Sequence, residues 1–312
     1  MNKLIFEKEG FVLVNNIFSH EDVCNILNLI DNYIKKHKDK FEMHEINYTK
    51  SGLVNSIHCL HKYDSSIIDY VKKNEKFMNN INTLLDDEVE IVVAEAFLKP
   101  PGEGMPSPNH QDNNLWCLEK GDAFTCWIAL DDIDEKNGGL KLWKRSHKVG
   151  ALQHEESFKP GTSQTLREEE YQIVGGKNNY LVNKLKAGDI QFHHSLTVHG
   201  SDANLTDRSR RVLTVQVFSK KDSRCPILWK KYKDSLMKQK IENKGLTVSL
   251  IEKTISCEDA YQILDDPWGQ IQKENSEKFN LITFFSNFLY NEKNCKKFLE
   301  LGSGLGLSLI HI

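Results

Sequence analysis

Short apolar runs separated by turn-forming residues fill the first two thirds of the chain. Residues 11–14 (FVLV) predict a first strand, and residues 91–98 (IVVAEAFL) predict a longer one. Further short strands are expected at residues 124–130, 140–143, 180–182, 188–194 and 211–218. Many short strands bounded by turns indicate an all-β sandwich or barrel.

Two helical patterns interrupt this series of strands. The segment 19–22 (SHED) is typical of a helix start with a capping box, and apolar residues follow at helical spacing to about residue 36. Residues 70–85 favour further helical turns. The stretch 146–177 is polar and irregular, so we expect a lid or an insertion there.

The composition narrows the classes of function. The chain has 312 residues, of which 39% are hydrophobic and 27% charged, and its net charge of -3 gives no reason to expect a nucleic-acid partner. No apolar run approaches the ~20 residues of a membrane-spanning helix, and charges begin too early for a signal peptide. The seven cysteines are scattered singly, so we expect reduced thiols, no structural zinc site and a cytoplasmic location.

Two histidines and an aspartate in two distant segments are candidate metal ligands. His110 and Asp112 are separated by one residue, and the strand expected there would place both side chains on one side. His199, in the segment TVHGS, is the candidate for the third ligand. Two histidines and one carboxylate are the usual ligands of non-haem Fe(II) oxygenases, and they leave the opposite side of the metal open.

Arg210 adds a second kind of chemistry to these ligands. A guanidinium group suits a two-pronged contact with a carboxylate. A small dicarboxylic acid could bind the metal at one end and Arg210 at the other, and 2-oxoglutarate fits this description. His193 and His194 lie on the strand before His199, and we expect them to pack or to support the ligands rather than to bind metal.

Several motifs in order resemble the phytanoyl-CoA dioxygenase family of Fe(II)- and 2-oxoglutarate-dependent oxygenases, over roughly residues 5–220. The matching segments are EGFV at 9–12, KPPG at 99–102, HQD at 110–112, WIALDD at 127–132, NGGL at 137–140, SHK at 146–148, GDI at 188–190 and HGS at 199–201, followed by Arg210. Where the family often reads Pro-Gly-Ser-His, this chain has KRSH at 144–147, a difference that concerns a turn and not a metal ligand.

The resemblance implies a double-stranded β-helix (jelly roll, cupin-like), so we expect a mainly β fold with flanking helices. The change of character after about residue 222 predicts a helical C-terminal extension. It implies Fe(II) as the metal, 2-oxoglutarate and O2 as cosubstrates, and ascorbate as a supporting reductant. Fe(II) would be bound by His110, Asp112 and His199, with no catalytic residue beyond these ligands. The residues it assigns to 2-oxoglutarate are Arg210, which would bind the distal carboxylate, and Ser201, Trp127 and Gln111.

The C-terminal residues carry a different motif. The segment FLELGSGLG at 298–306 resembles the first motif of S-adenosylmethionine-dependent methyltransferases, particularly the protein-lysine type, and an ordinary glycine-rich loop is the alternative. We therefore expect a jelly-roll dioxygenase domain at 1–222, a helical linker at 223–295, with helices at 257–264 and 277–289, and the truncated start of a methyltransferase at 296–312.

These observations predict an Fe(II)- and 2-oxoglutarate-dependent dioxygenase that hydroxylates a small-molecule or lipid-like substrate and releases succinate and CO2. No nucleic-acid partner and no membrane span are expected. Two alternatives stay open: an oxygenase-like accessory domain of a truncated methyltransferase fusion, and a non-catalytic jelly-roll binding module. The sequence does not specify the substrate.

Overall fold

The computed structural model describes residues 2–42, 45–58, 60–159 and 162–243. The strands are β1 (Phe11–Val14), β2 (Ile46–Tyr48), β3 (Val54–Ile57), β4 (Val89–Phe97), β5 (Ser107–His110), β6 (Ala123–Ala129), β7 (Leu140–Leu142), β8 (His154–Lys159), β9 (Thr162–Leu166), β10 (Leu181–Val182), β11 (Ile190–His194), β12 (His199–Ser201) and β13 (Val212–Ser219). The helices are α1 (Asn2–Glu9), α2 (His20–His37), α3 (Ser66–Lys72), α4 (Glu75–Leu84), α5 (Asn113–Trp116) and α6 (Pro226–Asn243), with short 3-10 helices η1 (Ser146–Val149) and η2 (Glu168–Gln172).

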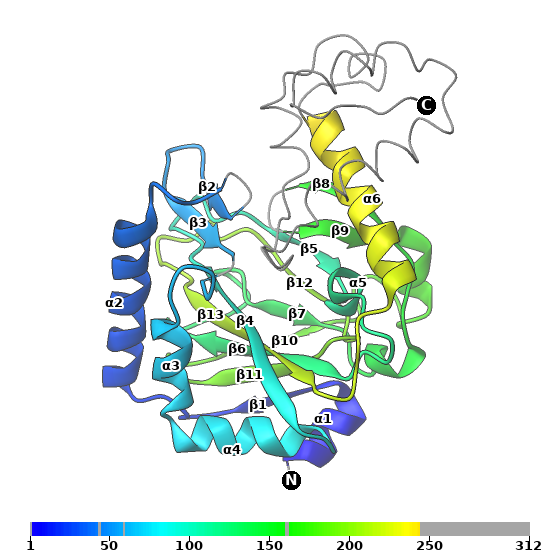
Figure 1. The fold of residues 1–312 in the computed structure, drawn as a ribbon, viewed down its shortest axis with the longest axis horizontal. Coiled ribbons are helices and arrows are strands. Elements are labelled where there is room, and N and C mark those ends of the chain that lie inside the picture. Colours follow the sequence, from blue (N-terminus) through cyan, green and yellow to red (C-terminus); the bar gives the residue numbers. More distant parts are fainter. Residues whose placement is uncertain (1, 43–44, 59, 160–161, 244–312) are drawn as a thin grey trace, which may run out of the picture. The chain divides into compact units, whose positions relative to one another are not determined.

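Two antiparallel sheets form the body of the fold (Figure 1). The larger sheet has seven strands in the order β1-β11-β6-β13-β4-β3-β2, and the smaller has four in the order β10-β7-β12-β5. Strands β8 and β9 form a separate hairpin. The mainly β architecture with flanking helices is therefore confirmed.

One face of the larger sheet packs against helices. Side chains at alternate positions of its strands, such as Ala94, Phe124 and Val215, are fully buried in one core with Ile26 of α2 and Phe77 of α4. Figure 1 shows α2, α3 and α4 along this side of the molecule. We call it the outer face.

The helices begin where the sequence provides caps. Asp22 N donates to Ser19 Oγ (3.1 Å) and Ser19 N donates to Asp22 Oδ2 (2.9 Å), which is the expected capping box. The pattern at 70–85 is divided between α3 and α4, because Asn74 caps a new helix by accepting from Phe77 N (3.0 Å).

The inner face of the larger sheet is turned toward the smaller sheet. Trp127 and Val212 pack there against Leu140 and Leu142 of β7. Polar side chains, among them Thr125 of β6, occupy the remaining part of this face and are also buried. The inner face therefore combines an apolar contact between the sheets with a polar interior in which a site can form.

Residues 146–177 are more regular than expected. They contain η1, the β8–β9 hairpin and η2, and Leu152, Leu166 and Tyr171 pack with Trp143 in a buried cluster. The expectation of an irregular stretch is wrong because single apolar residues such as Leu152 and Leu166 hold this region, and in β9 the other buried positions are the polar Thr162 and Gln164.

The chain divides into two units, Met1–Tyr232 and Lys233–Ile312, and the functional residues described below belong to the first. The expected boundary at residue 222 stays a prediction. The helices expected at 257–264 and 277–289 and the methyltransferase-like segment at 296–312 lie outside the described residues.

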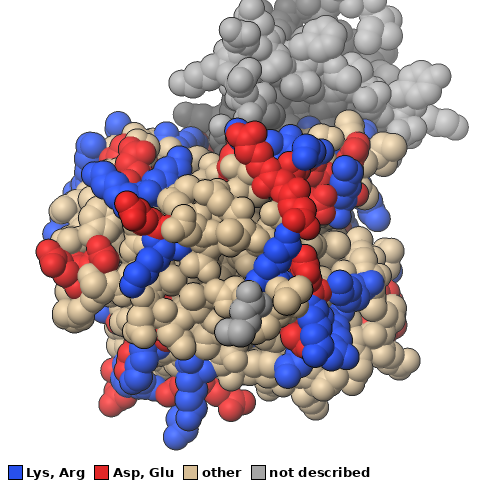
Figure 2. Space-filling model, turned by 90° about the horizontal axis from the view of Figure 1, so that it is seen from below, with Lys and Arg blue, Asp and Glu red and all other residues tan. Residues whose placement is uncertain are grey.

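Among the helices that are described, none is long and apolar enough to cross a bilayer. Acidic and basic side chains are interspersed on the face shown in Figure 2.

Gly188 permits a close approach between the start of β11 and the segment before α2. Its φ is +95°, and a Cβ at this position would lie 2.1 Å from the Phe18 carbonyl oxygen. Gly188→Ala should therefore lower the free energy of unfolding by more than the roughly 1–2 kcal/mol of left-handed backbone strain alone. Gly52→Ala is the matched control, because Gly52 has a φ of +86° and no neighbour within 4 Å of the added Cβ. Equal losses in thermal denaturation of the two variants would contradict this expectation.

Candidate metal centre

The three predicted ligands meet between the two sheets. His110 ends β5 and His199 begins β12, and the two residues are partners in the antiparallel register, with ring centroids 4.4 Å apart. Asp112 Oδ1 lies 3.5 Å from His110 Nε2 and 3.4 Å from His199 Nε2. All three side chains are buried, and one potential ligand atom of each lies within 4.8 Å of the others.

Asp112 reaches this position without being part of a strand. Strand β5 ends at His110, and Asp112 has helical backbone angles (φ -57°, ψ -37°) just before α5. The expectation that one alternating strand aligns His110 and Asp112 is therefore wrong. A turn at the end of the strand brings the carboxylate beside the two imidazoles instead.

Gln111, between the two ligands, fixes this turn. Its Nε2 donates to the carbonyl oxygens of Gly150 (2.9 Å) and Leu196 (2.7 Å), and its Oε1 accepts from Leu152 N (2.8 Å). The described contacts thus use both amide protons and one oxygen lone pair for backbone groups. Its expected contact with a cosubstrate stays a prediction.

Both histidine ligands are oriented by the same local device. His110 Nδ1 lies 2.8 Å from the carbonyl oxygen of Pro108, and His199 Nδ1 lies 2.9 Å from that of Thr197, in each case two residues earlier. A carbonyl oxygen only accepts, so each Nδ1 carries the proton and each Nε2 has a lone pair for a metal.

His154 makes the same contact between Nδ1 and a carbonyl oxygen, but its Nε2 binds a backbone amide. Its Nδ1 lies 3.0 Å from the Leu152 carbonyl oxygen, but its Nε2 accepts from Gln111 N (3.0 Å). Burial lowers the pKa of His154 to about 4, so the ring is neutral as this bond requires. Sequence reasoning missed His154, because nothing in its local sequence connects it with the ligand segment.

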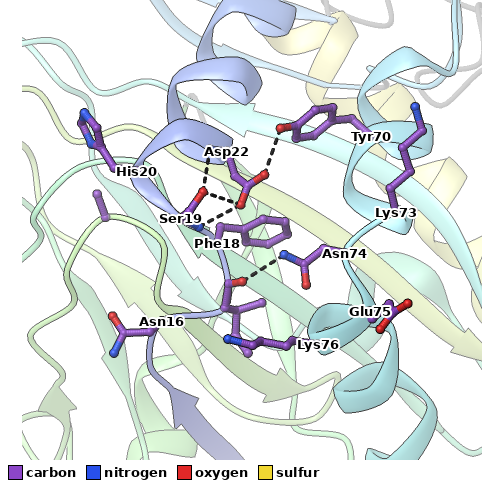
Figure 3. A pocket seen from close by; sticks show the side chains of 12 residues that line it. Asn16, Phe18, Ser19, His20, Asp22, Tyr70, Lys73, Asn74, Glu75 and Lys76 are labelled. Carbon is purple, nitrogen blue, oxygen red and sulfur yellow. Dashed lines mark hydrogen bonds between the residues drawn. The ribbon is translucent and has the colours of Figure 1, made fainter.

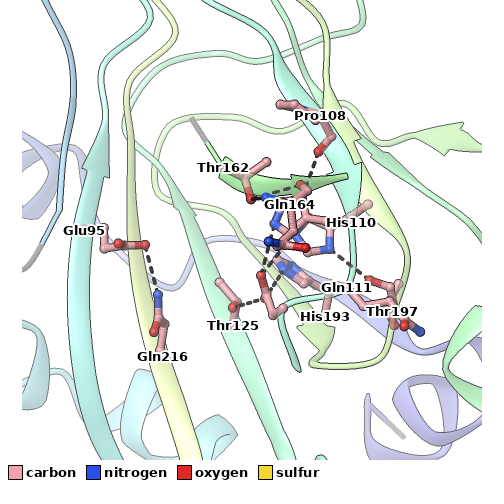
Figure 4. A network of polar contacts seen from close by, with 12 residues as sticks. Glu95, Pro108, His110, Gln111, Thr125, Thr162, Gln164, His193, Thr197 and Gln216 are labelled. Atoms are coloured by element: carbon pink, nitrogen blue, oxygen red, sulfur yellow. Dashed lines mark hydrogen bonds and ion pairs between the residues drawn. The ribbon is translucent and has the colours of Figure 1, made fainter. Parts of the chain in front are cut away.

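The second oxygen of Asp112 is held away from the histidine ligands. Thr125 Oγ1 donates to Asp112 Oδ2 (2.7 Å), and His193 Nε2 lies 3.3 Å from the same oxygen. Figure 4 shows Thr125 and His193 near His110. Burial, together with the nearby His199, lowers the pKa of His193 to about 4. Thr125 and His193 therefore leave Oδ1 as the oxygen that faces His110 and His199.

Asp112 and His199 each shift the pKa of the other toward the charged form. Burial by itself would raise the pKa of Asp112, but the surrounding histidines, His199 first, hold it well below its usual range. Burial would likewise lower the pKa of His199, yet the Asp112 carboxylate raises it. An ionised carboxylate and two oriented imidazoles suit a divalent transition metal. With metal–ligand bonds of about 2.0–2.2 Å, one ion could reach Asp112 Oδ1 and both Nε2 atoms, which lie 3.5 and 3.4 Å from that oxygen.

Two buried cations lie next to the ligand group. Lys99 Nζ donates to Ser201 Oγ and to the Asp202 carbonyl oxygen, both at 2.6 Å, and Arg210 donates to the same Ser201 Oγ (3.4 Å). Arg210 is 2% exposed, and its guanidinium carbon lies 5.4 Å from the centroid of the Trp127 ring. The structure thus brings Arg210, Ser201 and Trp127 together, and it adds Lys99, which sequence reasoning missed. Their expected contact with 2-oxoglutarate stays a prediction.

Lys99 and Arg210, which we call the cationic pair, have no acidic side chain paired with them in the described residues. Burial, with the adjacent Arg210, holds the pKa of Lys99 well below its usual range, and burial lowers that of Arg210 to about 9. In the described residues neither side chain forms an ion pair with a carboxylate. An anionic group bound here would relieve the repulsion and desolvation of both cations.

A separate surface pocket of about 790 Å³ lies among the helices of the outer face (Figure 3). Its polar side chains serve the surrounding structure: Tyr70 Oη donates to Asp22 Oδ1 (3.0 Å), and Asn74 Nδ2 donates to the Ile17 carbonyl oxygen (2.9 Å). The larger sheet separates this pocket from the ligand group, so we assign it no part in the chemistry.

Several known proteins are similar to this chain in sequence. The sequence model of the family described as phytanoyl-CoA dioxygenase (PhyH) matches residues 6–212. An ectoine dioxygenase of Bordetella bronchiseptica is 27% identical over 213 residues (64% of this chain and 69% of that protein). The peroxisomal phytanoyl-CoA dioxygenase of Bos taurus is 24% identical over 227 residues (67% and 65%).

Solved structures extend the likeness to the fold. EctD from S. alaskensis, solved with 2-oxoglutarate and 5-hydroxyectoine, has a TM-score of 0.57 at 20% identity and covers 70% of this chain and 74% of its own. The carbocyclase SnoK from nogalamycin biosynthesis, described as non-haem and α-ketoglutarate-dependent, has a TM-score of 0.58 at 18% identity and covers 72% and 85%. These likenesses confirm the expected double-stranded β-helix.

The contact between Thr125 and Asp112 provides a test of the metal centre. Thr125→Val keeps the shape of the side chain but removes the hydrogen bond to Asp112 Oδ2, so affinity for Co(II) should fall about 10- to 100-fold. Thr125→Ser, which keeps the hydroxyl, should restore most of it. Equilibrium dialysis measures both, and equal Co(II) affinity of the valine variant and the native protein would contradict the role given to Thr125.

Proposed function

The chain belongs to the phytanoyl-CoA dioxygenase family, and we propose that His110, Asp112 and His199 form its iron centre. The protein is an Fe(II)- and 2-oxoglutarate-dependent dioxygenase. The observation that carries the ligand assignment is the convergence of two oriented Nε2 atoms on one oxygen of Asp112. Fe(II) bound there supplies open coordination positions for 2-oxoglutarate and O2.

The cationic pair supports a position for the cosubstrate. One carboxylate of 2-oxoglutarate would lie against Arg210 and Lys99, with Ser201 Oγ between them, while the other end reaches the metal. Trp127 would form one wall of this site, because its ring already lies beside the Arg210 guanidinium. Binding here would satisfy Arg210 Nε, which is buried and has no hydrogen-bond partner in the described residues.

The remaining chemistry is the hydroxylation of a small molecule. Relatives named as dioxygenases of ectoine, hypophosphite and phytanoyl-CoA differ widely in substrate, so the family leaves the substrate open. A non-catalytic binding module would have no need of a complete and oriented ligand set, and the accessory-domain alternative rests on residues outside the described part. The four free cysteines in the described residues agree with a reducing, cytoplasmic location.

Loss of one ligand should abolish turnover. The native protein, supplied with Fe(II), ascorbate, O2 and a panel of substrates, should convert 2-oxoglutarate to succinate, and His110→Ala should reduce this to background because the metal loses an imidazole. His20→Ala is the matched control, since His20 is exposed and lies at the start of α2. Absence of metal-dependent succinate from the native protein would overturn the enzymatic function.

Loss of a cosubstrate contact should have a narrower effect. Arg210→Ala should raise the KM for 2-oxoglutarate about 10- to 100-fold, because a charged hydrogen bond contributes about 1.5–3 kcal/mol. Its Co(II) affinity should stay close to native. Arg208→Ala, which removes a partly exposed guanidinium paired with Asp134, should leave the KM unchanged. An unaltered KM in the Arg210 variant would remove Arg210 from this role.

A further inference from the structure

Two cysteines that are far apart in the sequence lie on adjoining segments. Leu118 and Arg224 form an isolated antiparallel bridge, so Cys117 and Cys225 are the next pair of opposing residues along the two segments. Cys225 N donates to the Cys117 carbonyl oxygen (2.7 Å), so the backbones of the two cysteines are in direct contact. Opposing residues of antiparallel segments have Cα atoms about 4.5–5.5 Å apart, within the range of about 4.4–6.8 Å that a disulfide bond requires.

The two thiols are close enough to influence each other. Burial raises the pKa of the Cys117 thiol to about 11, while nearby Arg224 lowers this pKa and the Cys225 thiol raises it. Cys117 is 2% exposed and Cys225 is half-buried, and both are free thiols in this structure. The Cys117 thiol donates weak hydrogen bonds to the carbonyl oxygens of Asn114 (3.6 Å) and Leu115 (3.8 Å), which offer little resistance to a new bond.

The other cysteines in the described residues have different surroundings. Cys24 is exposed on α2, and Cys126 is fully buried in the core at the outer face of the larger sheet. Cys117 instead follows the last residue of α5, and Cys225 precedes the first residue of α6. A bond between Cys117 and Cys225 would therefore join the ends of two helices.

The helix that ends at Cys117 begins at a candidate metal ligand. Leu115 N and Trp116 N both donate to the Asp112 carbonyl oxygen (2.9 and 3.1 Å), so α5 is built on the residue that we assign to the metal. A crosslink at Cys117 would fix the far end of this short helix and would thereby restrain the turn that positions Asp112.

We propose that Cys117 and Cys225 are a redox-active pair, whose disulfide bond fastens the helix after Asp112 to the start of α6 under oxidising conditions. A small-molecule disulfide such as oxidised glutathione is the oxidant. Cys225, the more exposed thiol, forms a bond to one glutathione sulfur and releases the other glutathione. The Cys117 sulfur then bonds to the Cys225 sulfur and releases the second glutathione. Two electrons pass to the oxidant, and the two cysteine protons end on the two released glutathiones.

The test first looks for the bond itself in the full chain. The reduced protein is equilibrated with oxidised glutathione, alkylated and digested with trypsin. Trypsin cleaves after Lys120 and Arg224, so Cys117, Cys126 and Cys225 fall in three separate peptides. Mass spectrometry without reduction should show the peptides of Cys117 and Cys225 joined, and dithiothreitol should separate them.

The bond should also stabilise the folded chain. It closes a loop of roughly a hundred residues and so removes conformational entropy from the unfolded state, which should raise the melting temperature by about 5–15 °C. Dithiothreitol should return the melting temperature to that of the reduced protein.

Cys225→Ser should abolish both the joined peptides and the rise in melting temperature, because a hydroxyl cannot form the bond. Cys24→Ser is the matched control, since it removes an exposed cysteine of α2 and should retain both. If native protein yields no joined peptides, or keeps glutathione on Cys225, the proposal is wrong and the two cysteines only pack beside the bridge. Joined peptides without a reversible rise in melting temperature would contradict the fastening role. Both measurements begin with native protein, so they do not depend on the folding of a variant.

Discussion

Every central strand of the larger sheet has to satisfy two environments at once, because its side chains alternate between the faces. On β6, Phe124 and Cys126 enter the core shared with the helices, while Thr125 and Trp127 face the metal centre and the cationic pair. A shift of one residue in this strand would exchange the two sets completely. The apolar packing on the outer face therefore determines which side chains are available for chemistry on the inner face.

The function of each histidine in this interior is decided by what meets its Nε2. His110, His154 and His199 all have Nδ1 against a carbonyl oxygen two residues earlier. In His154 the remaining nitrogen accepts from a backbone amide, whereas in the other two it faces Asp112. The same local geometry thus produces a structural crosslink in one place and a candidate metal ligand in another, depending on which group of the neighbouring segment meets Nε2.

The sequence predicted the jelly roll, because the strand pattern is clear. It also named the three residues that the structure brings together as a candidate ligand group, because their types are chemically distinctive. The reason offered for pairing His110 with Asp112 was wrong, since a turn and not a strand aligns them. Lys99 was read only as part of a loop motif, because its contact with Ser201 joins residues far apart in the chain. The β8–β9 hairpin was missed because its apolar positions are too few to form a visible period.

The cationic pair of Lys99 and Arg210 has a consequence for the stability of the folded protein. Lys99 and Arg210 are buried together without a carboxylate partner in the described residues, so the folded state retains an uncompensated repulsion there. A dicarboxylate that binds this pair acts as a missing counter-ion of the interior and stabilises the folded chain by mass action. If 2-oxoglutarate is that dicarboxylate, as proposed above, its concentration would set the resistance of the enzyme to unfolding as well as its rate of turnover.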